Sequence, residues 1–131
     1  MSHVSIPINN EGDLVTARLQ GRDIAEDIGF GPFAQTLIST AISELARNIL
    51  LYARTGTLAV ESVTEGQRQG VRVQAIDEGP GIEDVETAQR EGYSTAGGLG
   101  MGLAGVQRLM DEFSIESEPG RGTTVEVVKW L

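Results

Sequence analysis

The order of elements along the 131-residue chain predicts an α/β protein of the α+β kind, a two-layer sandwich with one mixed β-sheet and its helices on one face. Hydrophobic periodicity gives strand, helix, helix, two strands, loop, helix and two strands, which is not a regular βαβ alternation. The length suits one two-layer core, and no repeat, low-complexity tract or linker divides the chain. We therefore expect a single domain over residues 1–131.

A short strand and a helix are predicted at the start of the chain. Residues 3–8 alternate between polar and apolar, and Pro7 indicates a position at the edge of the sheet. Residues 11–29 have helical periodicity, although Gly21 interrupts the pattern. The candidate core residues of this helix are Leu14, Ala17, Leu19, Ile24 and Ile28.

The longest predicted helix spans residues 33–54 and follows the start signal Gly31-Pro32. Its candidate buried stripe consists of Leu37, Ile38, Ala41, Leu45, Ile49 and Tyr52. Beside this stripe, Glu44 and Asn48 share one face, one turn apart, with Thr40 and Arg47 flanking them. A carboxylate that can take a proton, next to an amide oxygen that can bind a hard cation, is a candidate catalytic edge. Taken alone, such a pair is more often an ordinary solvated helix face.

The second half of the chain is predicted to hold a hairpin, a sharp turn, a short acidic helix, a glycine-rich loop, a helix and a final strand pair. The hairpin pairs residues 57–64 with 70–77, and the sharp turn covers 77–82. The short acidic helix is expected over 83–91, the glycine-rich loop over 92–102 and the next helix over 103–113. The final strand pair consists of residues 114–117 and 123–130.

The composition excludes several classes of site. The chain has 10 basic and 19 acidic residues and a formal net charge of −9, whereas a nucleic-acid partner requires a basic stripe. Lys129 is the only lysine and His3 the only histidine, which excludes a mid-chain catalytic lysine, a histidine triad and a histidine-rich metal site. The chain has no cysteine, no signal-peptide pattern and no apolar run that could span a bilayer. We expect a cytoplasmic protein with no nucleic-acid or membrane partner.

The glycine-rich loop contains a sequence with the spacing of a dinucleotide-binding fingerprint. Gly100-Met101-Gly102-Leu103-Ala104-Gly105 matches G-x-G-x-x-G, but residues 91–98 before it do not form the buried strand that this fold requires. A Gly-Lys-Ser/Thr phosphate loop is also absent from the sequence. Two interpretations stay open: a glycine loop whose backbone N–H groups bind phosphate at a helix start, or a surface loop.

Four motifs occur in a fixed order: Glu44-x-x-x-Asn48, Asp77-x-Gly79-x-Gly81, Gly97-Gly98-Leu99-Gly100-Met101-Gly102-Leu103 and Gly122-Thr123-Thr124. In this order and spacing they resemble the N, G1, G2 and G3 boxes of the Bergerat-fold (GHKL) ATPases. That family includes heat-shock chaperones, type II topoisomerases, histidine-kinase catalytic domains and small bacterial serine kinases. The resemblance covers nearly the whole chain from residue 30 onward. Each motif is weak alone, but the ordered set is specific.

The resemblance implies a role for each matching residue. Asn48 would hold Mg²⁺ against the triphosphate of ATP, and Glu44 would be the catalytic base for an attacking hydroxyl. Asp77 would accept a hydrogen bond from the exocyclic amine of adenine, with Thr123 supporting that contact. The other implied nucleotide-binding residues lie where the base and the phosphates approach the backbone, and they are Gly79, Gly81, Gly97, Gly98, Gly100, Met101, Gly102 and Leu103.

Within the family, the chain resembles the small serine/threonine kinases of partner-switching pathways, and most closely the stressosome switch kinases. Residues 42–48 and 102–113 carry this likeness. It implies a serine or threonine on a STAS-domain stressosome protein as substrate. The released kinase would then activate a downstream output protein, such as a PP2C-type phosphatase.

Two alternatives stay open. An anti-sigma factor kinase would sequester a sigma factor and phosphorylate a STAS antagonist, but such kinases more often have Ala where this chain has Ile49. A non-enzymatic adaptor would bind nucleotide only as a folding ligand, and it would have no need of a base such as Glu44 beside the Mg²⁺ ligand.

Overall fold

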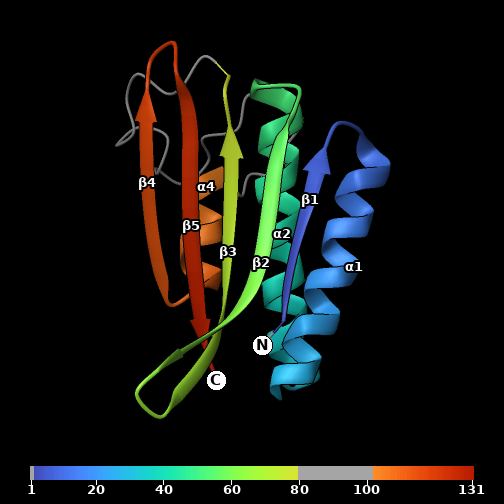
Figure 1. Cartoon of the computed structure of the whole chain (residues 1–131), viewed down its shortest axis with the longest axis vertical. Coiled ribbons are helices and arrows are strands. Elements are labelled where there is room, and N and C mark those ends of the chain that lie inside the picture. The colour runs from blue at the N-terminus through green and yellow to red at the C-terminus, as the bar shows by residue number, and fades with distance from the viewer. Residues whose placement is uncertain (1, 80–101) are drawn as a thin grey trace.

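A β-sheet covered on one face by helices forms the framework of the protein in the computed structural model (Figure 1). The structure describes residues 2–79 and 102–131. The elements are β1 (His3–Ile8), α1 (Glu11–Ile28), α2 (Pro32–Tyr52), β2 (Gly56–Glu65), β3 (Arg68–Asp77), α4 (Gly102–Leu109), β4 (Glu112–Glu118) and β5 (Gly122–Trp130). The predicted two-layer sandwich is confirmed. The acidic helix expected over 83–91 and the loop over 92–101 lie outside the described residues.

The described strands form one sheet in the order β1-β2-β3-β5-β4, and all four pairings are antiparallel. The mixed sheet expected from the sequence is therefore wrong for this part of the chain. The reason lies in the connection between β1 and β2, which contains two helices. The second helix returns the chain to the end at which β1 finished, so β2 runs back alongside β1 (Figure 1). The edge position predicted from Pro7 is confirmed, because β1 lies at the end of the strand order.

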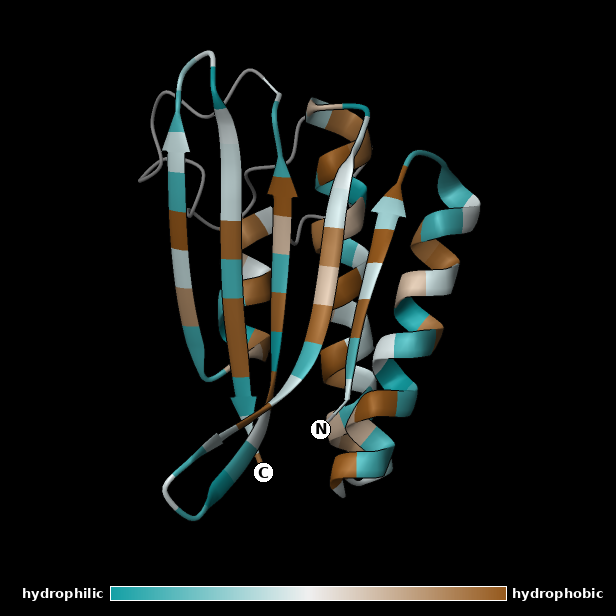
Figure 2. Ribbon diagram, in the orientation of Figure 1, coloured by the Kyte–Doolittle hydropathy of each residue, from teal (hydrophilic) through white to brown (hydrophobic). Residues whose placement is uncertain are grey.

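The strand register aligns apolar side chains in rows across the helix-covered face of the sheet. Two such rows are Val4, Val60, Val73, Val127 and Phe113, and Ile6, Leu58, Ala75, Val125 and Ile115. Figure 2 shows the corresponding alternation of hydrophobic and polar bands along the strands. These rows pack against buried residues of α1 and α2 in one core. No described helix is long and apolar enough to cross a membrane.

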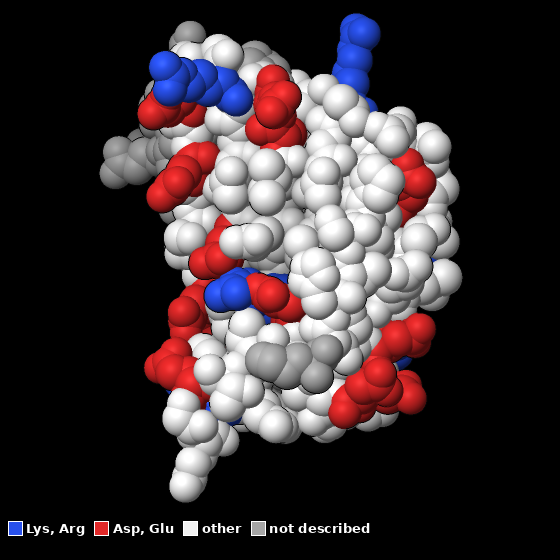
Figure 3. All heavy atoms as spheres, viewed as in Figure 1, with Lys and Arg blue, Asp and Glu red and all other residues white. Residues whose placement is uncertain are grey.

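The other face of the sheet is free of helices in the described part of the chain. At its centre Arg72 forms an ion pair with Glu61, and Gln74 Nε2 donates to Glu126 Oε1 at 2.7 Å. Figure 3 views this side of the molecule, where charged groups gather on the left half and near the right margin and the remaining surface is largely uncharged.

Close packing of α1 on α2 explains the glycine inside the first helix. A Cβ built on Gly21 would lie 2.2 Å from Cδ1 of the fully buried Ile42. The contact stripe of α1 therefore runs through Leu14, Ala17, Gly21 and Ile24. The prediction that Leu19 belongs to the core is wrong, because it lies off this stripe and is 53% exposed.

Two further apolar positions were misplaced by the sequence pattern. Tyr52, expected in the buried stripe of the long helix, is its last residue and lies exposed. Phe113, expected at the end of the helix over 103–113, lies in β4, because α4 ends at Leu109 and the chain turns back into the sheet. There it still packs against the core.

Gly21→Ala is expected to destabilise the protein although alanine favours helices. The added methyl collides with Ile42 and overpacks the core at a cost of about 1–3 kcal/mol, only partly offset by a gain in helix propensity of about 1 kcal/mol. Ile42→Val removes the colliding Cδ1, so we expect Gly21→Ala to cost less in that background. Urea unfolding of both single variants and the double variant measures this coupling. Additive losses would contradict the collision.

Candidate active site

The long helix α2 carries an acidic side chain inside the protein. Glu44 is only 3% exposed, and Nη1 of Arg47 donates to its Oε2 at 3.2 Å. Asn48 lies one turn beyond Glu44 and is half-buried. The sequence-predicted pair is thus at the boundary between core and surface, and a fully solvated helix face is excluded for Glu44.

The last cross-strand row on the helix-covered face of the sheet is polar. Register places Asp77 opposite Thr123 and Thr123 opposite Ser117. The hydroxyls of Thr123 and Ser117 lie 2.8 Å apart, and Ser117 Oγ also donates to the backbone oxygen of Gly122 at 3.2 Å. The backbone N–H of Gly79 donates to Asp77 Oδ1 at 2.9 Å, which fixes the carboxylate at the end of β3. One edge of the apolar core is therefore lined by hydrogen-bonding groups.

Three glycines make room around Asp77. A Cβ on Gly122 would lie 2.1 Å from the backbone oxygen of Asp77, and one on Gly56 would lie 2.8 Å from Cγ2 of Ile49. A Cβ on Gly79 would lie 2.6 Å from Cβ of Ala53, the residue that caps α2. The end of β3 is thus pressed against the C-terminal end of α2. Figure 1 shows α2, β3 and β4 ending at the same end of the molecule, where β5 begins.

Of the remaining predicted site residues, Gly102 and Leu103 lie within the described part of the chain. Gly102 and Leu103 are buried in the first turn of α4, a helix that packs against α2. Gly102 has a positive φ of 50° at this turn. Gly81, Gly97, Gly98, Gly100 and Met101 lie outside the described residues, so their expected role stays a prediction.

Sequence reasoning missed two contributors to this site. Gly122 was noted only as part of a motif, and its contact with β3 follows from a strand pairing that the motif does not specify. Ser117 was not singled out, although a tight turn over 119–121 implies that it faces Thr123. Strand register is the signal that finds Ser117.

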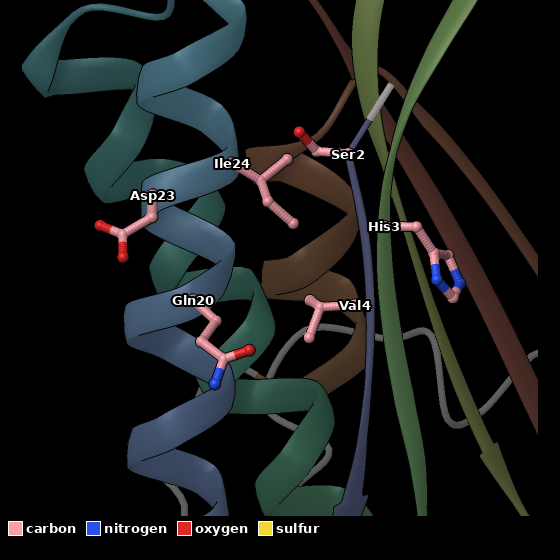
Figure 4. Close-up of a pocket in the computed structure, with 6 residues that line it drawn as sticks. All are labelled: Ser2, His3, Val4, Gln20, Asp23 and Ile24. Carbon is pink, nitrogen blue, oxygen red and sulfur yellow. The ribbon is translucent and has the colours of Figure 1, made fainter.

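A separate pocket lies between β1 and α1 (Figure 4). Val4 and Ile24 point into it, whereas His3 and Asp23 point away from it and from each other. It lacks the converging polar groups that mark a reaction site, and it is bordered by α1 and not by the helix that carries Glu44.

Three features of the structure agree with one family of ATPases. They are the buried carboxylate on α2, the polar row at the end of β3 and the two-layer fold. Residues 33–131 match the family model described as histidine kinase-, DNA gyrase B- and HSP90-like ATPase. The chain is 50% identical to the serine/threonine-protein kinase RsbT of Bacillus subtilis, over 96% of this chain and 95% of that protein. It is 34% identical to an anti-sigma F factor of a Thermoanaerobacter species, over 72% of this chain and 68% of that protein.

Solved structures of low sequence identity share the fold. The RsbU and RsbW domains of Rv1364c from Mycobacterium tuberculosis match with a TM-score of 0.69 and 22% identity, over 98% of this chain and 32% of that one. The SiaB–SiaC complex from Pseudomonas aeruginosa matches with a TM-score of 0.58 and 15% identity, over 100% of this chain and 90% of that one.

The chain belongs to the GHKL family of histidine kinase-, gyrase- and HSP90-like ATPases. Within that family it is a protein serine/threonine kinase of the partner-switching group, and it uses ATP.

Gly122→Ala is expected to cost more stability than Gly120→Ala, its matched control. Both glycines have positive φ values, 115° and 82°, so each alanine costs about 1–2 kcal/mol in backbone strain. Only the Cβ at Gly122 also meets the backbone of β3, whereas nothing lies within 4 Å of the Cβ at Gly120. Urea unfolding and ATP titration of both variants test this. Equal stability and equal ATP affinity would contradict the close approach of β5 to Asp77.

Proposed function

We propose that this kinase transfers the γ-phosphoryl group of ATP to a serine or threonine of a STAS-domain stressosome protein. The observation that carries the chemistry is a buried carboxylate, Glu44, one helical turn from Asn48 on a helix whose end packs against Gly79, two residues beyond Asp77. The identity to RsbT and the order of the four motifs support the choice of substrate class.

The adenine end of the proposed nucleotide site is the polar row of β3 and β5. Gly79 N–H occupies Oδ1 of Asp77, so Oδ2 is the oxygen that we assign to the exocyclic amine of adenine. Thr123 supports this contact from the neighbouring strand, and Ser117 orients its hydroxyl. The glycines around Asp77 keep side chains away from the base.

The phosphate end of the proposed site is the Asn48 face of α2 and the start of α4. A side-chain amide oxygen beside a carboxylate is a donor set that suits Mg²⁺, which typically binds through one or two protein oxygens plus phosphate oxygens and water. Asn48 would hold the ion, and the ion would neutralise charge on the phosphates when bound. Gly102 and Leu103, together with residues 97–101, would cover the phosphates.

Glu44 is the base in the proposed reaction. It takes the proton of the substrate hydroxyl as that oxygen forms its bond to the γ-phosphorus. The bond from the γ-phosphorus to the bridging oxygen breaks, ADP leaves with the electron pair, and the phosphate monoester stays on the substrate. The low exposure of Glu44 keeps bulk water from competing for the same position.

Release from the STAS scaffold would free the kinase to activate an output protein in the cytoplasm, and a PP2C-type phosphatase is our assignment for that partner. We further propose that residues 1–131 act as one domain. The second candidate function is an anti-sigma factor kinase, which the 34% identity to anti-sigma F factors favours. A pull-down that recovers a sigma factor in place of STAS proteins would establish that alternative.

Asp77→Asn is expected to weaken ATP binding by about 10- to 100-fold, because an amide replaces the charged acceptor of the adenine amine. Asp23→Asn, on the exposed face of α1, is the control and should bind like the parent chain. Titration with ATP measures both affinities. Unchanged affinity in Asp77→Asn would overturn the adenine assignment.

Glu44→Ala is expected to keep ATP affinity within about twofold and to slow phosphotransfer by about 10²- to 10⁴-fold, the usual contribution of a general base. The assay follows radiolabelled phosphate from ATP with Mg²⁺ to a STAS-domain protein. Glu26→Ala, an exposed glutamate on α1, serves as the control. If Glu44→Ala transfers phosphate at the parent rate, Glu44 is not the base.

A further inference from the structure

The proposed base has one hydrogen-bond partner within the described part of the chain. Nη1 of Arg47 donates to Oε2 of Glu44 at 3.2 Å, from the next turn of the same helix. The Glu44 side chain is 4% exposed, and that of Arg47 is 31% exposed. The guanidinium therefore lies between the buried carboxylate and solvent.

Burial makes this ion pair different from an ordinary pair on a helix surface. Exposed pairs three residues apart contribute little, because water already solvates both charges. A carboxylate removed from water loses most of its solvation, so a charged hydrogen-bond partner matters more to it than to an exposed carboxylate. Arg47 supplies that partner to Glu44.

The geometry also divides the carboxylate between two tasks. Arg47 occupies Oε2, and no described residue hydrogen-bonds to Oε1. One oxygen is thus anchored, and we assign the other to the proton of the substrate hydroxyl. A guanidinium is planar and always charged, so it can hold the anchored oxygen without competing for the proton.

We propose that Arg47 is the positioning residue for the catalytic base: it holds the Glu44 carboxylate in place through one oxygen, and it does not bind the phosphates of ATP. This inference rests on the proposed role of Glu44 and extends it to a residue with no role in the four motifs. The guanidinium of Arg47 is directed to Glu44 through Nη1, which is the contact that the proposal uses.

Three variants and a control test the proposal. We expect Arg47→Ala to lower the single-turnover rate of phosphotransfer to the STAS protein by 10- to 100-fold. Its ATP affinity, measured separately by titration, should stay within twofold of the parent value, which also reports a folded site. Arg47→Lys keeps the charge and should recover much of the rate. Arg22→Ala on α1 should match the parent in both measurements.

The double variant Glu44→Ala/Arg47→Ala separates positioning from a direct role. If Arg47 acts only through Glu44, the double variant transfers phosphate at the rate of Glu44→Ala alone. An additional loss of rate, or a weakening of ATP affinity that matches the loss of rate in Arg47→Ala, would overturn the proposal in favour of phosphate binding. An unchanged rate in Arg47→Ala would overturn it as well.

The same variants are assayed for slow hydrolysis of ATP by water, in which Glu44 would take the proton of the attacking water. This arm keeps the test valid if the STAS protein accepts no phosphate. A loss with Glu44→Ala but not with Arg47→Ala refutes only the positioning role, whereas parent activity in Glu44→Ala refutes the role of Glu44 as the base, on which the positioning role rests.

Discussion

The packing of the C-terminal half of α2 against the ends of β2 and β3 is the constraint on which the site depends. Ile49 reaches the backbone at Gly56, and Ala53 reaches Gly79, at distances that leave no space for a Cβ on either glycine. Ile49 is also part of the buried core, so core packing and site assembly use the same helix residues. Because a close-packed interior resists small displacements, these contacts fix the Glu44 and Asn48 turn of α2 relative to Asp77.

The sheet contributes polar side chains to the proposed site, because its last row on the helix-covered face is polar. The two rows through Val73 and Ala75 on the covered face are apolar, and in the next row Asp77, Thr123 and Ser117 lie side by side. The twofold periodicity of strands explains why Asp77 faces the helices, since Val73 and Ala75 precede it on the same face. A shift of one residue in the β3–β5 register would place Asp77 and Thr123 on opposite faces of the sheet. The hydrophobic core therefore specifies the register that builds the adenine side of the proposed site.

Elements with strong periodicity could be predicted from the sequence, and contacts between elements could not. The strands and helices lie close to their expected ranges because local alternation reports burial directly. The direction of β2 depends on the two helices that connect it to β1, because the second helix returns the chain to the end at which β1 finished. The exposure of Leu19 depends on the contact of Gly21 with Ile42, which sets the buried side of α1. Spacing alone predicted that Glu44 and Asn48 share one face of a helix. It did not predict that Glu44 is buried and paired with Arg47, because spacing gives proximity on a helix and not burial.

The charges of the chain place a further limit on how phosphate can be held. The only lysine, Lys129, is near the far end of β5 from Thr123, where it donates to the backbone oxygen of Leu109 and lies 3.7 Å from Asp111. Arg68, Arg72 and Arg121 each pair with a neighbouring glutamate. If Arg47 is committed to Glu44, the site gains little positive charge from these side chains. In a chain of net charge −9, the proposed site would therefore rely mainly on backbone N–H groups and a divalent cation to offset the charge of a triphosphate. This reliance agrees with the proposed assignment of the phosphates to the glycine-rich motif and of the cation to Asn48.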